Sequence, residues 1–588
     1  MKKPLTDEDL QERAGIDGRV TFAVAVFLGA AGLVALLDRI GVPERFVEVL
    51  GPAVALVGLA TIGILLRTMR ISRFYAGGRA MPAAYAGLAM ASLGTALFLP
   101  FLPPFAGAIS LPGLLSGMAG GIVIAAMLTG PLLRKTGAFS VPDLIASRFP
   151  NVALRLGVVT VVSASGFLVA LAGFGMAVES LTSIGASHGL GVWLVGIALA
   201  VIAAPGGLAG VGWAAAGAAG ILAAGLGLPL VMLVVRGDSL PLPVAGEARQ
   251  WEAAIARILE WQGTQDHAAG AVIVAAIMLG LGVLAPLLAP AIATAGRASA
   301  QRTGAAALAW IATLAVIIAA TLAISALAFD RRVAGARPAD LPQSILAASA
   351  AGGVRICGGH PGAPAAVAAA CGAQPGFQGV LRKSDAAASG SFLVRALPDL
   401  TGLGRAFSGL ATAGLLAVAL VLAAAGFHTA ATALGHDAFY RVSDVSAMTS
   451  RRLAVTRMLA VGAIVLAGFV LSQGTPDPRT LIGLAIALCA ASIAPLLLLS
   501  LWPRAESSDA TIALLAGLAA AETILFFGGT APTIEIFARA AVFAAFVSLT
   551  AGLATSLLRR ADPTGHGAAF VHGVLHGDNE VLHPDKGA

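Results

Sequence analysis

Three polar residues stand close together inside a long apolar stretch, and one of them can carry a proton. His428, Thr429 and Thr432 interrupt the run from Phe407 to Leu434, which is otherwise mostly alanine, leucine and valine. In a helix, positions 428 and 432 share one face. An ionisable group within a membrane-length apolar segment is rare and marks a candidate functional residue. Because imidazole titrates near neutral pH, His428 is a candidate proton acceptor or donor to a carboxylate.

Each of these residues also has a purely structural explanation. Threonine in a membrane helix commonly donates its hydroxyl hydrogen to a carbonyl of the preceding turn, and we favour this for Thr429 and Thr432. A neutral imidazole bonded to a neighbouring helix explains His428 as well as proton transfer does. Ser163 and Ser165 could line a path through the apolar segment Leu156–Val178, although packing is the favoured explanation.

Further ionisable residues favour structural explanations. Glu522 is expected to be buried in its apolar segment, where a lone carboxylate is costly unless paired or protonated. A structural hydrogen bond or a subunit contact is favoured there over transport. His566, His572, His576 and His583 lie among glycine, aspartate and proline near the C terminus, with no cysteine beside them. They indicate a flexible cytoplasmic tail rather than a metal site.

The composition places all of these residues in a membrane protein. Hydrophobic residues make up 58% of the 588 and charged residues 11%, against roughly 25% charged in soluble domains. The net charge of +7 is explained by loops that fix the membrane topology, so we expect no nucleic-acid partner. The chain has no His-Glu-x-x-His or phosphate-loop motif. We therefore expect no catalytic residues, no enzyme and no cofactor.

Apolar runs of about 20 residues, the length that crosses a bilayer, predict about fourteen transmembrane helices. They are centred on Val20–Leu37, Val47–Leu66, Ala83–Pro103, Gly113–Leu133, Leu156–Val178, Gly189–Ala204, Val211–Val235, Ala269–Ala293, Gly304–Ala328, Phe407–Leu434, Leu453–Leu471, Leu481–Leu501, Ile512–Phe527 and Ile536–Leu558.

Charge placement predicts which loops are cytoplasmic. Arginine and lysine gather after the even-numbered segments, as at Arg70, Arg73 and Arg134. The loops Phe105–Pro112 and Thr182–Leu190 carry neither residue. By the positive-inside rule, both termini are cytoplasmic. The chain is then a multi-pass protein of the plasma membrane, the inner membrane of a bacterium.

Two outer loops are long enough to hold structure. Residues 236–265 contain Trp251, Ile255, Ile258 and Leu259 at helical spacing. This spacing fits an amphipathic helix at the membrane interface, or equally a helix packed on the outer ends of the bundle. Residues 330–405 hold Cys357 and Cys371, which we expect to form a disulfide on the oxidising side of the membrane. Cys489 is expected to pack within a span.

Several motifs together resemble those of a known family. They are Phe74–Pro82 (FYAGGRAMP), Leu132–Gly137 (LLRKTG), Val141–Asp143, Gly435–Arg441 (GHDAFYR) and the tail from Leu575 to Ala588. The chain resembles the sodium:solute symporter family, nearest the cation/acetate symporter-like (large-subunit) branch. The resemblance implies a cation-coupled secondary transporter for a small organic anion such as acetate. Its coupling ion would be a sodium ion or a proton.

The resemblance also implies the fold. It is an all-α polytopic membrane protein with a leucine-transporter-like core of five plus five inverted-repeat helices and extra flanking helices. The expected parts are 1–70 with two extra helices, 71–236 as the first repeat, 237–268 as an outer loop, 269–502 as the second repeat with an insertion at 329–405, 503–560 with two more helices, and the tail 561–588. Gly94 and Pro100, and Gly280, Gly282, Pro286 and Pro290, fall in the first helix of each repeat. These breakers predict discontinuous helices.

Relatives hold sodium through carbonyls of the first core helix and hydroxyls of the eighth. Counting from Ala89–Leu93 puts the carbonyl positions at Ser92 and Thr95. The hydroxyl positions fall on Val421 and Leu422, and the aspartate that follows them in relatives falls on Ala424, none of which has a side chain that can ligate sodium. Trp213 survives from a signature whose other polar members are replaced. We therefore expect protons or a relaxed cation site rather than strict sodium dependence.

The lost polar positions support an alternative. The chain could be a transport-degenerate relative that serves as a subunit, sensor or regulator. In either case the expected partners are membrane lipid, a small organic anion, and a small membrane subunit or a second copy of the chain.

Overall fold

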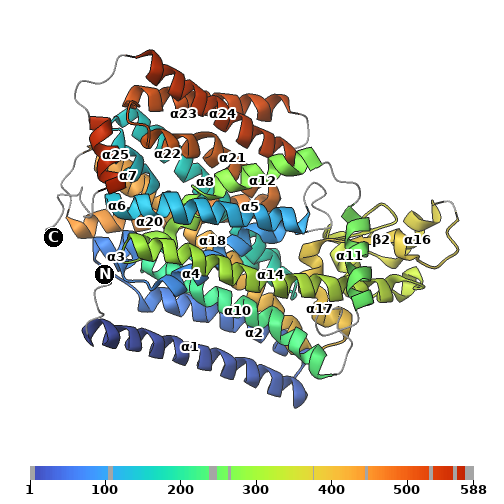
Figure 1. Ribbon diagram of the computed structural model, residues 1–588. Coiled ribbons are helices and arrows are strands. Elements are labelled where there is room, and N and C mark those ends of the chain that lie inside the picture. The colour runs from blue at the N-terminus through green and yellow to red at the C-terminus, as the bar shows by residue number, and fades with distance from the viewer. Residues whose placement is uncertain are drawn as a thin grey trace.

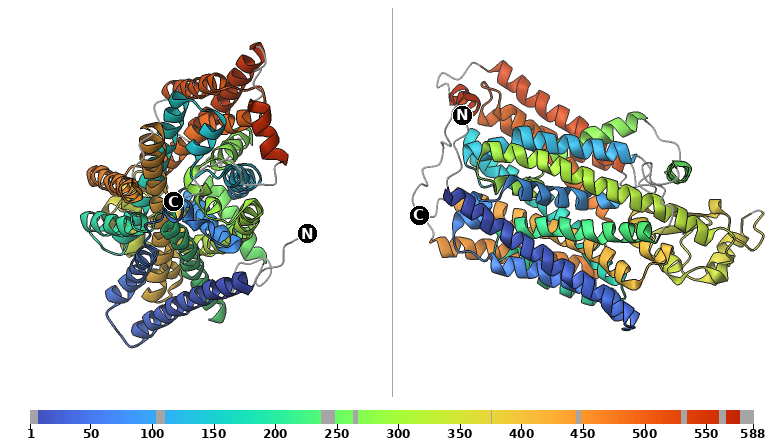
Figure 2. Two further views of the ribbon diagram at one scale, coloured as in Figure 1. Left: turned by 90° about the vertical axis from the view of Figure 1, so that its left-hand side faces the viewer. Right: turned by 60° about the horizontal axis from the view of Figure 1, so that its bottom comes forward.

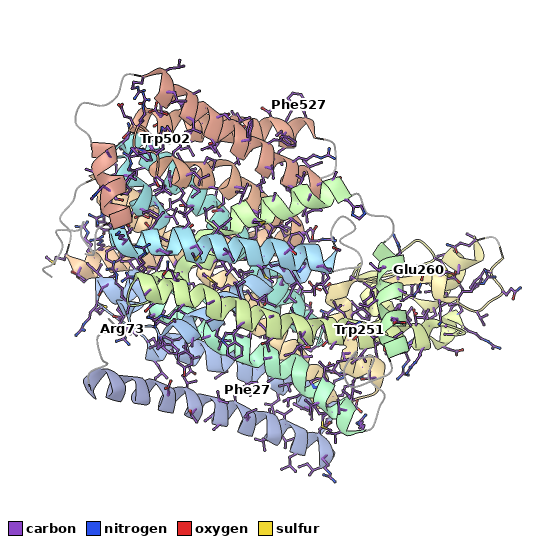
Figure 3. The ribbon with its side chains drawn as sticks, in the orientation of Figure 1. Phe27, Arg73, Trp251, Glu260, Trp502 and Phe527 are labelled. Carbon is purple, nitrogen blue, oxygen red and sulfur yellow. A yellow bond between two sulfur atoms is a disulfide. The ribbon has the colours of Figure 1, made fainter. Side chains whose placement is uncertain are left out.

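The structure, a computed structural model, is almost entirely helical (Figure 1). It describes residues 7–102, 110–236, 248–262, 267–374, 376–443, 448–528, 534–559 and 566–576. Long helices lie side by side, and a small domain projects at one end (Figure 1, Figure 2). We call the end that carries this domain the outer end and the opposite end the inner end. Figure 3 shows Arg73 and Trp502 toward the inner end, and Trp251 and Glu260 toward the outer end.

The first half of the chain forms helices up to residue 235. These are α1 (Asp7–Arg39), α2 (Glu44–Leu65), α3 (Ile71–Ala76), η1 (Gly77–Arg79), α4 (Ala83–Phe98), η2 (Leu99–Phe101), α5 (Leu111–Ile124), η3 (Ala125–Thr129), α6 (Gly130–Thr136), α7 (Val141–Arg148), α8 (Val152–Thr182), α9 (His188–Ala203) and α10 (Leu208–Val235).

The second half adds the remaining membrane-length helices and the small domain. They are α11 (Ala248–Gln262), α12 (His267–Leu281), α13 (Ala285–Ile292), α14 (Arg297–Val333), α18 (Arg405–Thr432), η6 (Ala433–Tyr440), α19 (Arg441–Ser443), α20 (Thr449–Gln473), α21 (Pro478–Leu488), η7 (Cys489–Ile493), α22 (Ala494–Ser500), α23 (Ser507–Phe527), α24 (Ile534–Leu558) and α25 (His566–His576). The outer domain comprises η4 (Pro338–Asp340), α15 (Gln343–Ala350), β1 (Val354–Ile356), α16 (Pro364–Gly372), η5 (Lys383–Asp385), β2 (Ala386–Ala388) and α17 (Gly390–Thr401).

The predicted all-α polytopic architecture is confirmed. Within the described residues, eleven helices are long and apolar enough to cross a membrane, and the bent pair α12–α13 raises the number to twelve. The 16-residue helix α9 and the apolar part of α1 account for the other two predicted segments. Each of the fourteen predicted segments therefore coincides with a helix or a helix pair.

Helix α18 is the central helix of the bundle. Of the most apolar 18 residues of the span that it forms with η6, 89% are buried. Its glycines let neighbouring backbones come very close: a Cβ on Gly426 would stand 2.5 Å from the Gly166 carbonyl oxygen of α8. A Cβ on Gly409 would stand 2.4 Å from the Glu48 carbonyl oxygen of α2. Small residues thus allow α18 to pack tightly in a setting where association depends on close contact.

The two expected helix breaks have different outcomes. α12 and α13 are bent by 46° across residues 282–284, and the buried Thr129 hydroxyl donates to the Gly282 carbonyl oxygen at 2.7 Å. The predicted break in the second repeat is therefore present. In the first repeat, α4 runs uninterrupted past Gly94, so a break there was wrongly predicted. A Cβ on Gly94 would make ordinary contact with Met118 Sδ at 3.5 Å, and Pro100 is the second residue of the 3₁₀ turn η2, where the first turn of a helix tolerates proline.

The outer domain is built around a short hairpin and a disulfide. β1 and β2 pair antiparallel, with Val354 opposite Ala388 and Ile356 opposite Ala386. Cys357, just after β1, is bonded to the buried Cys371 in α16. Cys489 is a buried free cysteine in η7.

Helix α11 packs on the outer end of the bundle through a charged contact. The buried Arg257 donates from Nε to both oxygens of Asp330 in α14, at 3.2 and 3.0 Å. Ile255 and Leu259 are exposed, so they remain available to a membrane interface. Of the two explanations for this helix, packing on the bundle is present in the structure.

Two expectations near the C terminus were wrong. Glu522 is exposed on α23 rather than buried, because the neighbouring residue Ala521 faces the bundle instead. His566, His572 and His576 lie in the helix α25 and not in an irregular tail; His583 lies outside the described residues. Phe570 and Val571 are buried, and Phe570 lies 5.7 Å from the Arg148 guanidinium. These apolar contacts explain why this segment is helical despite its glycines.

Candidate functional site in the central helix

A polar stripe runs along the inner end of α18 and continues into η6. It consists of His428, Thr432, His436 and Tyr440, each four residues after the last, and all four are buried. His428 Nε2 lies 3.5 Å from the Thr432 hydroxyl oxygen, at the limit of hydrogen-bonding distance. The imidazole packs edge-on against Phe74 of α3, with ring centroids 5.4 Å apart. His428 and Thr432 are therefore brought together as their spacing predicted.

The lower part of the stripe holds a buried histidine–aspartate pair. His436 Nδ1 lies 2.8 Å from Asp437 Oδ1, and the two side chains are 0% and 1% exposed. Because an ionised carboxylate can only accept, the proton of this bond belongs to Nδ1. Within the described residues, His436 Nε2 and Asp437 Oδ2 have no hydrogen-bond partner. Both residues lie in the π-helix η6, a form of helix that is frequent at functional sites.

Tyr75 of α3 packs against the part of the stripe that contains His436. Its hydroxyl lies 2.7 Å from the Thr456 hydroxyl of α20, and its ring lies 4.8 Å from the His436 ring. Gly77 ends α3 in the left-handed region (φ 61°), which allows the chain to turn directly after this aromatic pair. Burial raises the pKa of Tyr75 to about 12, so the phenol stays neutral and keeps its proton at physiological pH.

Cationic side chains cover this cluster at the inner end. The Arg452 guanidinium lies 5.9 Å from the Tyr75 ring and 5.8 Å from the Tyr440 ring. Arg441 Nε lies 3.8 Å from an oxygen of the buried Asp143. Together with the aromatic rings, these cations stand at the inner end of the stripe.

The two candidate sodium-carbonyl residues lie elsewhere, on α4. Ser92 and Thr95 are buried, and the Thr95 carbonyl oxygen accepts a hydrogen bond from the Leu99 N–H. The Ser92 hydroxyl has no partner among the described residues. The counted hydroxyl positions Val421 and Leu422 are fully buried and apolar.

The other candidates are dispersed around the stripe. Ser165 donates to the Val162 carbonyl oxygen at 3.2 Å, and the half-buried Ser163 has no hydroxyl partner among the described residues. Thr429 faces α8, where its Cγ2 lies 3.5 Å from the position of a Cβ on Gly166. Trp213 packs against Tyr85 with ring centroids 5.3 Å apart, so it belongs to the α4–α10 contact rather than to the stripe.

Sequence reasoning did not select His436 and Asp437 as site residues. Both residues were considered only as part of the motif Gly435–Arg441, which contributes to the family resemblance. The signal was nevertheless present, because His436 stands eight residues after His428 and shares its helix face. Tyr75 and Thr456 lie 381 positions apart, and no spacing rule brings such residues together.

The helices described here form the leucine-transporter-like fold. A solved structure of a Na⁺-coupled sialic acid symporter, in a substrate-bound outward-open state, matches with a TM-score of 0.63. The match covers 88% of this chain and 98% of that one at 15% identity, which establishes likeness of fold. A nucleobase-cation-symport-1 family transporter in a closed conformation matches with a TM-score of 0.45 at 14% identity, over 84% of this chain and 97% of that one.

Sequence comparisons cover less of the chain. No protein-family model matches it. A protein of Cupriavidus necator described as an uncharacterized symporter is 33% identical over 144 residues. That match spans 24% of this chain and 21% of the relative's length.

Proposed function

We propose that this protein is a secondary active transporter that moves a small organic anion, such as acetate, together with a cation. The fold that it shares with a Na⁺-coupled sialic acid symporter and the partial match to a symporter support this class. The observation that carries the proposal is the buried polar stripe on α18. Four polar side chains at a spacing of four residues, in the most buried helix of the bundle, are costly unless they serve a function.

The stripe supports proton coupling, or coupling to a cation held at a relaxed site. His428 would accept a proton within the bundle. His436 already donates Nδ1–H to Asp437, so its Nε2 is the atom left to receive a proton. Sodium coupling has its own support in the Na⁺-coupled structural neighbour. However, Val421 and Leu422 offer no oxygen to a hard cation, which needs several oxygen ligands.

The bend between α12 and α13 supports an anionic substrate. α13 begins at Ala285, within the bundle. The N terminus of a half-helix carries a partial positive charge, and in transporters it points at anionic groups of the substrate. A carboxylate placed beside Ala285 would be attracted there without any cationic side chain.

A transport-degenerate role as a subunit, sensor or regulator is the second candidate. It is favoured by a small pocket at the outer end of α4 that is lined by Phe98, Phe101, Ile277, Ile486 and Phe537, among other apolar residues. Such a lining does not suit a carboxylate, because an unpaired charge is costly there.

Uptake of labelled acetate by the purified chain in proteoliposomes tests the proposal. We expect saturable accumulation driven by an inward pH gradient, with protein-free liposomes as the control. Propionate and pyruvate, offered as competitors, define the substrate class. If no small carboxylate accumulates under either a pH or a sodium gradient, transport is excluded in favour of the second candidate.

A further inference from the structure

The hairpin formed by α23 and α24 presents an unusual surface at the edge of the molecule. Figure 1 shows these two helices outermost in the bundle, and Figure 3 shows Phe527 at the tip of the hairpin. Glu522 is exposed on this surface, one turn below the exposed Phe526, and no hydrogen bond or ion pair of Glu522 occurs within the described residues. An unpaired carboxylate on a lipid-facing helix is costly, which favours a partner that pairs with Glu522.

The exposed residues of α23 follow a coiled-coil repeat. Ile512, Leu515, Ala519, Glu522 and Phe526 are all exposed, and they are separated by alternating steps of three and four residues. This spacing forms a straight seam along one side of a helix, the pattern with which one helix packs against another. A polar residue within such a seam fixes the register and the choice of partner.

The exposed residues of α24 form a second seam with the opposite charge. Arg539, Phe543, Phe546 and Thr550 are exposed and follow steps of four, three and four residues. Among the described residues, the ion pair of Arg539 is a loose one, 3.8 Å from Glu535 in the same helix. Since a guanidinium has five donor hydrogens, Arg539 retains capacity to bind a second carboxylate.

The two seams match in depth. The Ser548 hydroxyl of α24 donates to the Ala513 carbonyl oxygen of α23 at 2.7 Å. Glu522 stands nine residues after Ala513, and Arg539 stands nine residues before Ser548. By this contact Glu522 and Arg539 lie at about the same depth along the hairpin. The contact of Gly528 with Ile536 instead gives a difference of roughly 5 Å between their depths, a distance that an arginine side chain spans.

We propose that the α23–α24 hairpin is the docking surface for a second copy of this chain, related by a twofold axis along the membrane normal. Such an axis preserves depth, so Glu522 of each copy faces Arg539 of the other. The same register places Phe543 of one copy opposite Ala519 of the other, a large side chain against a small one. The interface thus contains two equivalent Glu522–Arg539 pairs, and in each pair the carboxylate and the guanidinium neutralise each other.

A second copy fits better than an unrelated membrane subunit because the surface is complementary to itself. One seam supplies the carboxylate and the small residue, and the other supplies the guanidinium and the large residue. An isologous twofold contact needs this arrangement, whereas an unrelated subunit would need only one seam. The inference is independent of whether the protein transports.

The test is single-molecule photobleaching of the fluorescently labelled full chain, diluted in liposomes of phosphatidylethanolamine and phosphatidylglycerol. We expect dimers. Glu522→Arg and Arg539→Glu should each weaken dimerisation by about tenfold or more, and the double variant should restore it. Arg337→Glu, a charge reversal on the exposed surface of the outer end, is the matched control and should have no effect.

A second variant tests the same interface without changing a charge, because a charge reversal can itself cause misfolding. Ala519→Leu fills the small position with an apolar side chain that lipid tolerates, and it should weaken the dimer. Val465→Leu, on the exposed face of α20, should not. Monomers at all dilutions of the wild-type chain would overturn the proposal and leave the surface to a different protein. Dimers that are unaffected by Glu522→Arg and Ala519→Leu would overturn it in favour of another interface.

Discussion

At the scale of single residues, the polar stripe on α18 combines two different environments. His428 faces the Phe74 ring and, at 3.5 Å, the Thr432 hydroxyl. His436 lies against Asp437 at 2.8 Å, so a countercharge is present. The stripe therefore offers His428 aromatic and hydroxyl neighbours, and it offers His436 a carboxylate neighbour toward the inner end.

Tyr75 gives a prediction at alkaline pH. Its pKa is raised above the ordinary value of 10.0 to about 12 by burial, so the folded state favours the neutral phenol. This contribution to stability is complete below pH 10 and is lost as pH rises through 12. Tyr75→Phe cannot ionise, so its melting temperature should fall less than that of the wild type between pH 10 and 12.

Thermal unfolding in detergent at several pH values measures this difference. Comparison at pH 8, where the Tyr75 phenol is neutral, supplies the reference. Parallel loss of stability in wild type and Tyr75→Phe would contradict the assignment.

At the scale of elements, the apolar runs predicted every membrane-length helix and the bend at residues 282–284, because length, hydropathy and helix breakers act locally. Tertiary packing decided the rest. Gly94 stays helical because it fits against Met118. The π-helical turn at His436 and the contact of Tyr75 with Thr456 depend on elements that meet only in the folded chain. For the site, the sequence therefore predicted His428 and Thr432 as neighbours but not the lower half of the stripe.

Close packing of α18 gives the second prediction. A Cβ on Gly426 would come within 2.5 Å of the Gly166 carbonyl oxygen, and backbone on both sides leaves little room to move. Gly426→Ala should therefore lower the free energy of unfolding by about 1–3 kcal/mol. Gly220→Ala, where a Cβ meets nothing within 4 Å, should be neutral or slightly stabilising. Chemical denaturation in mixed micelles compares the two, and equal stability would contradict the packing of α8 on α18.

The buried ion pair beneath α11 gives the third prediction. Arg257 and Asp330 are 8% and 9% exposed, so Arg257→Ala leaves a buried carboxylate without its countercharge. We expect a loss of about 3 kcal/mol and faster proteolysis of α11. Glu260 also contacts Arg257 but is 63% exposed, and Glu260→Gln should cost less than about 1 kcal/mol. Limited proteolysis of both variants distinguishes a buried pair from an incidental one.

At the scale of the whole molecule, the two ends differ in the chemistry they present. The outer end carries the disulfide-linked domain, and the inner end carries the polar cluster beside Arg441 and Arg452. An oxidised disulfide fits the oxidising side of a membrane, and arginine-rich loops fit the cytoplasmic side. Both features support a cytoplasmic inner end.

The fourth prediction is that both termini are cytoplasmic in the inner membrane of a bacterium. Fourteen crossings return the chain to its starting side. A reporter that is active only in the periplasm, fused after Ala588, should be inactive, and the same reporter inserted after Gly372 in the outer domain should be active. Activity of the fusion at Ala588 would contradict an even number of crossings.

The most direct test of the central claim is acetate uptake by His428→Ala in proteoliposomes under an imposed pH gradient. If the stripe on α18 carries the coupling proton, this variant should lose at least about tenfold of the gradient-driven rate, because alanine cannot carry a proton in place of the imidazole. His267→Ala, an exposed histidine at the start of α12, should transport like the wild type. Saturable uptake that requires sodium, ignores the pH gradient and survives His428→Ala would contradict the account.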